Sequence, residues 1–140
     1  MAHDPSLASL APAVLVHLAF ASIALVLGPV ALWARKGSHG HRGFGYAWVT
    51  AMVGAALSAF FIRSSGSLQW AGFSPIHILA VVALVGVSSA IFAVVHRKIA
   101  LHRKIMQRTY FAACVGAGLF TLLPGRYLGD LLWHHALGLV

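Results

Sequence analysis

The run PIHILAVVALVGVSSAIFAVV, residues 75–95, contains no Asp, Glu, Lys or Arg, and it decides the class of the fold. A helix of this length spans about 30 Å, the thickness of the hydrocarbon core of a bilayer. Lipid offers no partner for backbone N–H and C=O groups, so an apolar run of this kind crosses a membrane as a helix. The stretch therefore predicts a membrane-spanning helix.

Three further apolar runs have a similar length, and they cover residues 13–33, 44–62 and 105–124. The chain is 60% hydrophobic and only 9% charged, whereas soluble domains carry roughly a quarter charged residues. We therefore predict an all-α fold, an integral membrane four-helix bundle forming one transmembrane domain over residues 1–140. The tail, residues 126–140, is too short to cross, and it is predicted to form a short helix at the outer interface.

The basic residues gather in the first and third loops between these runs. Eight of the ten Lys and Arg residues lie in these loops or just after the third: Arg35, Lys36, Arg42, Arg97, Lys98, Arg103, Lys104 and Arg108. The positive-inside tendency then places both loops in the cytoplasm and both termini outside. Because the charge sits in short loops and not on a polar face, the net charge of +8 does not indicate nucleic-acid binding. The first run is too long for a signal peptide and is expected to be retained.

Several features recur with a period of about sixty residues. His17 and His77 lie 60 residues apart, and His41 and His102 lie 61 apart. The order of these features predicts two helical hairpins related by an axis along the membrane normal. His17 and His77 would then lie near the outer face, and His41 and His102 near the inner face.

These histidines have two readings that the residues alone leave open. An imidazole inside a span can make an interhelical hydrogen bond worth roughly 1 kcal/mol, or it can serve a functional site. Zinc and copper sites prefer cysteine, carboxylate or clustered histidine ligands. Haem b instead needs two axial imidazoles from facing helices. We therefore expect haem iron between His17 and His77, and a second haem between His41 and His102.

Two arginines are the expected partners of the haem propionates. Arg63 and Arg126 fall on the same outer face as His17 and His77. The inner site is the weaker half of the hypothesis, because His41 and Arg63 are 22 residues apart. That separation is about 33 Å of helix, which puts His41 at the edge of the hydrocarbon. A single site would lie at the outer pair.

Four segments carry a resemblance to a known family. They read LGPVALWARKGSHGHRGFGYAWVTAM (residues 27–52), FSPIHILAVV (73–82), HRKIMQRTYF (102–111) and LFTLLPGR (119–126). Together they resemble an uncharacterised bacterial family of four-span membrane proteins over roughly Val14 to Leu132. The resemblance implies a fold and a location in the bacterial inner membrane, and it implies no activity. The order of the four histidines is also similar, more loosely, to that of transmembrane di-haem cytochromes b of the ferric and ascorbate reductase kind.

The leading functional hypothesis is a membrane b-type cytochrome that passes electrons through bis-His haem, with a quinone or a redox protein as partner. The alternative is a non-enzymatic four-helix subunit or homo-oligomer that packs in a larger complex and binds no cofactor. A proton path or transporter built on His17 lacks the buried acids that such paths usually employ. Asp4 and Asp130 are the only carboxylates, so hydrolysis by an acid–base pair is not expected.

Overall fold

The computed structural model describes residues 11–62, 73–123, 127–136 and 138. Every regular element in these ranges is a helix: α1 Pro12–Trp33, α2 His39–Ala59, α3 Pro75–Val95, α4 Ile99–Thr109, the π-helix η2 Tyr110–Val115, α5 Gly116–Thr121, α6 Tyr127–Asp130 and the π-helix η3 Leu131–Ala136. Backbone dihedrals stay in the right-handed helical region across both junctions of α4, η2 and α5. These three elements therefore form one continuous rod, called the fourth rod below.

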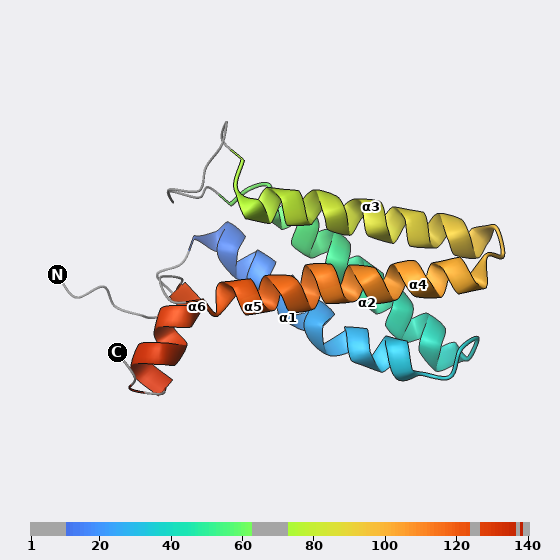
Figure 1. The fold of residues 1–140 in the computed structure, drawn as a ribbon, viewed down its shortest axis with the longest axis horizontal. Coiled ribbons are helices and arrows are strands. Elements are labelled where there is room, and N and C mark those ends of the chain that lie inside the picture. The colour runs from blue at the N-terminus through green and yellow to red at the C-terminus, as the bar shows by residue number, and fades with distance from the viewer. Residues whose placement is uncertain (1–10, 63–72, 124–126, 137, 139–140) are drawn as a thin grey trace.

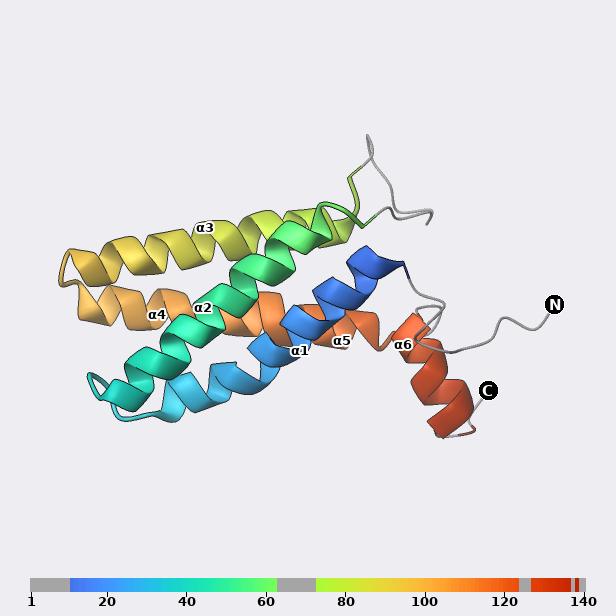
Figure 2. The ribbon, with the colours of Figure 1, turned by 180° about the vertical axis from the view of Figure 1, so that it is seen from behind.

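Two antiparallel hairpins pack side by side (Figure 1). The first consists of α1 and α2, and the second of α3 and the fourth rod. Both short turns inside the hairpins lie at the same end of the molecule, and the start of α1 lies at the other end, where α6 and η3 turn away from the rods (Figure 2). The two basic loops of the sequence are thus brought together at one end.

The second helix begins five residues before the predicted start at Phe44. Ser38 is its N-cap, and the Ser38 hydroxyl accepts a hydrogen bond from the backbone N–H of His41 at 3.1 Å. This bond satisfies one of the backbone donors that every helix start leaves free. Gly37 precedes the cap with a φ of +78°, a conformation that glycine adopts at little cost. The histidines of this loop therefore belong to the first turn of α2.

The fourth rod also begins earlier than the predicted Ile105. The turn before it holds only residues 96–98, because α3 ends in a tight left-handed cap at Arg97 with a φ of 59°. The N–H of Lys98 reaches the carbonyl of Ala93 at 2.8 Å, and that of Arg97 reaches Val94 at 3.0 Å. This pair of bonds is the Schellman arrangement, in which glycine is the usual residue. With no glycine to mark it, the early start could not be read from the sequence.

The core of the two hairpins consists mainly of alanine, and many of the large apolar side chains point outward. Ala90 and Ala93 are fully buried, whereas Trp33 is 84% exposed and Val26 is 66% exposed. Small residues allow membrane helices to approach closely where lipid removes the usual hydrophobic drive. Two described helices, Pro12–Trp33 and Pro75–Val95, are long and apolar enough to cross a membrane. The arrangement is therefore that of a protein whose surroundings are as apolar as its interior.

One partly buried contact ties the two hairpins together at the edge of this core. Pro29 lies inside α1 and has no N–H, so the carbonyl of Leu25 lacks its usual donor four residues on. The Tyr110 hydroxyl donates to that carbonyl at 3.0 Å. The Tyr110 ring lies against Gly28, where an added Cβ would come within 2.1 Å of the ring. The hairpins can approach this closely only because residue 28 has no side chain.

Candidate functional site

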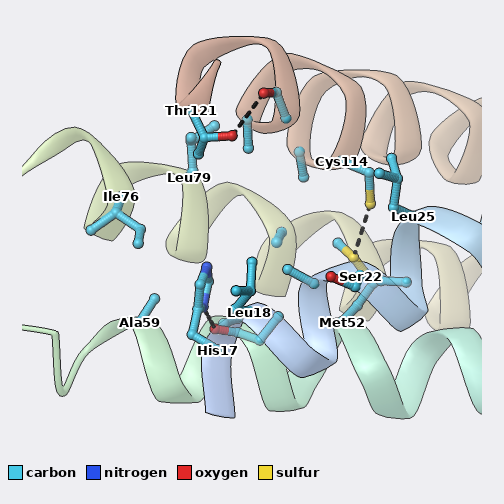
Figure 3. A pocket seen from close by; sticks show the side chains of 18 of the residues that line it. His17, Leu18, Ser22, Leu25, Met52, Ala59, Ile76, Leu79, Cys114 and Thr121 are labelled. Atoms are coloured by element: carbon cyan, nitrogen blue, oxygen red, sulfur yellow. Dashed lines mark hydrogen bonds between the residues drawn. The ribbon is translucent and has the colours of Figure 1, made fainter. Parts of the chain in front are cut away.

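A pocket of about 460 Å³ lies between the two hairpins (Figure 3). Its walls come from α1, α2, α3, η2 and α5, and Leu128 of α6 also lines it. The lining is mostly alanine and leucine, and its polar or sulfur-bearing members are His17, Ser22, Met52, Cys114 and Thr121. Pockets of this size and apolar character are typical of small-molecule sites.

Among the described residues that line this pocket, His17 is the one histidine. Its Nδ1 lies 2.8 Å from the carbonyl oxygen of Ala55 on α2 and 3.3 Å from the Ser58 hydroxyl. A carbonyl oxygen only accepts, so Nδ1 carries a hydrogen and donates it. The neutral ring then has a free lone pair on Nε2. Figure 3 shows the imidazole standing in the pocket.

His77, the predicted partner of His17, has a different role in the described structure. It is the third residue of α3, and its Nδ1 accepts a hydrogen bond from the backbone N–H of Ser74 at 3.2 Å. The rings of Phe60 and Phe73 flank it at centroid distances of 5.9 and 5.8 Å. His77 is not among the pocket-lining residues. A neutral His77 therefore carries its hydrogen on Nε2, the nitrogen that would have to ligate iron.

The two inner histidines make matching contacts. His41 Nδ1 lies 2.9 Å from the carbonyl oxygen of Ala31, and His102 Nδ1 lies 2.8 Å from that of Ala90. Each bond joins the start of the second helix of a hairpin to the end of its first helix. The contacts agree with the predicted repeat. They bind each histidine within its own hairpin, and the pairing of His41 with His102 on a haem stays a prediction.

The predicted propionate partners, Arg63 and Arg126, lie outside the described residues. Within the described ranges, no group of three or more His, Cys, Asp or Glu side chains could hold a metal ion. Haem needs no such group, since two imidazoles suffice for its iron. Of the outer pair, only His17 has the ring orientation that a metal ligand usually shows, with the second nitrogen donating to a carbonyl. A bis-His haem therefore does not fit His77 as it lies here.

At the basic end of the molecule, cations of the two hairpins lie close enough to repel one another. The Lys36 ammonium donates to the carbonyls of Leu32 and Ala34 at the end of α1. Partial burial, and secondly the nearby Arg103 of α4, hold the pKa of Lys36 below its usual range. A cation of the first hairpin therefore lies close to one of the second, as expected if both loops face the same compartment.

Sequence reasoning missed the deep end of the pocket. The Cys114 thiol donates to the Met52 thioether at a sulfur–sulfur distance of 3.4 Å, between η2 and α2. A single cysteine within an apolar run gives no signal in the sequence from which such a contact could be predicted. Pro29 did carry a signal, because a proline inside a helix leaves one carbonyl for another side chain to satisfy.

Comparison with known proteins agrees with the apolar fold. No curated protein and no solved structure matches the chain. A family model described as predicted membrane protein (DUF2306) matches residues 14–133. The match covers both hairpins, the pocket between them and the tail as far as Trp133. The chain therefore belongs to the family of predicted membrane proteins DUF2306.

Proposed function

We propose that this membrane protein binds one small apolar molecule in the pocket between its two hairpins. The observation that carries the proposal is the pocket itself, with a volume of about 460 Å³ and, among the described residues, the one imidazole of His17 in a lining mostly of alanine and leucine. Water gains little from such walls, and an apolar molecule fits them. This function agrees with the non-enzymatic alternative predicted from the sequence, and it adds a bound small molecule to that alternative.

Photolabelling tests this proposal. The probe is a naphthalene that carries a diazirine, used on the protein purified in detergent, with labelled peptides mapped by mass spectrometry. We expect labels on pocket-lining residues such as Cys114 and Leu79. Gly118→Phe is expected to reduce this labelling at least fivefold, because Gly118 lines the pocket and a Cβ there meets nothing within 4 Å.

A matched control lies half a turn away on the same helix. Gly116 is exposed and is not among the pocket-lining residues. Gly116→Phe adds the same ring and should leave pocket labelling as in the wild type. Equal labelling in both variants, or no label on the lining of the wild-type protein, would refute the proposal.

Haem b is a second candidate for this pocket, favoured by the ring orientation of His17 alone. His17 would hold the iron from one side, and the group would supply electron transfer when bound. The expected signature is a Soret band in protein purified with haem supplied, lost in His17→Phe and retained in His41→Phe. If His77→Phe also removes the band, the original bis-His pair is restored as the ligand set. A colourless protein would remove haem from consideration.

We further propose that the four rods all cross the bacterial inner membrane, with both termini outside. The clustering of the basic turns at one end and the positive-inside tendency support this orientation. In a Cys114→Ser background, Phe73→Cys and Lys104→Cys place single thiols at opposite ends. A membrane-impermeant maleimide applied to whole cells should label Phe73→Cys and label Lys104→Cys only after lysis. The reverse pattern would invert the topology.

A further inference from the structure

We propose that the ligand of the pocket carries a hydroxyl group, as an alcohol, a phenol or a quinol does, and that this hydroxyl donates to Nε2 of His17. The inference rests on the proposed function and names the chemistry of its ligand. It follows from the orientation of one ring and from the hydrogen bonds that the other polar groups of the pocket already make.

The ring orientation of His17 is fixed from the α2 side. Nδ1 donates to the Ala55 carbonyl at 2.8 Å, and the Ser58 hydroxyl, itself 2.9 Å from that carbonyl, lies 3.3 Å from the same nitrogen. Both groups hold the hydrogen on Nδ1. In the neutral ring Nε2 is left as an acceptor, and the described residues provide it with no hydrogen bond.

The remaining polar groups of the pocket do not favour a ligand that accepts a hydrogen bond over one that donates. The Thr121 hydroxyl donates to the carbonyl of Gly118 at 2.8 Å, and the Cys114 thiol donates to Met52. The exposed Ser22 hydroxyl can both donate and accept, so it favours neither kind of ligand. The polar group of the pocket that still lacks a partner among the described residues is therefore Nε2 of His17, and a ligand that donates a hydrogen bond would supply it.

The shape of the pocket places this acceptor at one end of the ligand. His17 and Leu25 both line the pocket on α1 and lie eight residues apart, about 12 Å along the helix axis. Met52 and Cys114 stand at the Leu25 end, where their polarisable sulfurs suit an apolar or aromatic body. A molecule with a hydroxyl at one end and an apolar body of about 12 Å meets both ends at once.

A pair of competitors isolates the hydroxyl. 1-Naphthol and 1-methoxynaphthalene share one ring system, and only the first can donate a hydrogen bond. In competition against the diazirine–naphthalene label, we expect 1-naphthol to displace the pocket label at about tenfold lower concentration in the wild-type protein. His17→Phe should abolish the difference, whereas His17→Gln, whose amide oxygen can accept, should keep part of it.

His41→Phe is the matched control, because it removes an equivalent imidazole–carbonyl bond outside the pocket. It should lose as much stability as His17→Phe and keep the wild-type preference for 1-naphthol. Equal competition by the two compounds, with labelling intact, would overturn the inference and leave the proposed function standing. Failure of the label itself to reach the pocket would overturn both.

Discussion

Gly28→Ala is expected to lower the free energy of unfolding by about 1–3 kcal/mol, the usual cost of overpacking a filled core. The added Cβ would lie 2.1 Å from Cε2 and 2.3 Å from Cδ2 of the Tyr110 ring. Tyr110 is 7% exposed and its hydroxyl is bound to Leu25. The ring therefore has to shift, and the hairpins have to separate slightly.

The measurement is unfolding of the purified protein in mixed micelles with increasing dodecyl sulfate, followed by helical circular dichroism. Gly118→Ala is the control, since a Cβ at Gly118 meets nothing within 4 Å. Alanine is the better helix former by about 1 kcal/mol, so this variant should be as stable as the wild type or more so. If Gly28→Ala unfolds together with Gly118→Ala, the close approach of α1 and the fourth rod is wrong.

Tyr110→Phe is expected to destabilise the protein by about 1–3 kcal/mol, because it leaves the Leu25 carbonyl without a donor in a partly buried contact between the hairpins. The reason lies in another residue, Pro29, whose ring nitrogen cannot make the helical bond. Pro29→Ala supplies an N–H four residues after Leu25. In the double variant Tyr110→Phe with Pro29→Ala, that N–H should meet the carbonyl and recover most of the loss.

A double-mutant cycle in the same unfolding assay measures this coupling. The expected coupling energy is at least about 1 kcal/mol, since Tyr110→Phe costs less once Pro29→Ala supplies the Leu25 carbonyl with a backbone donor. Pro29→Ala alone should have a small effect. Additive effects of the two changes would mean that the hydroxyl does not serve the carbonyl that Pro29 leaves free.

The sequence predicted the rods well where their ends carry an ordinary signal. Residues 75–95 were predicted as a helix and form α3, because Ser74 and Pro75 are typical of a helix start. The start of the fourth rod was missed, since Arg97 adopts the left-handed conformation without being glycine. The predicted start of α2 is too late, because the basic residues of this loop are interpreted only as a signal of membrane orientation. Ser38 is nevertheless a good N-cap.

The surroundings of the two outer histidines differ, for a reason that lies in the helix positions. His17 and His77 are 60 residues apart and were expected to be equivalent. His77 is only the third residue of α3, where the free N–H of Ser74 reaches its ring. His17 is the sixth residue of α1, almost one turn deeper, and its ring reaches α2 and the pocket instead. A sequence period cannot show this offset between two helix starts.

The imidazole–carbonyl bonds at the two basic turns join residues that are close in sequence, so each can form early during synthesis of the chain. His41 and Ala31 are 10 residues apart, and His102 and Ala90 are 12 apart. Each hairpin can therefore close its own bond as soon as it leaves the ribosome, before the rest of the chain exists. The bond between Tyr110 and Leu25 joins residues 85 apart and has to wait for the last rod. The two hairpins are thus self-contained in these bonds, and the pocket between them exists only when the hairpins have packed together.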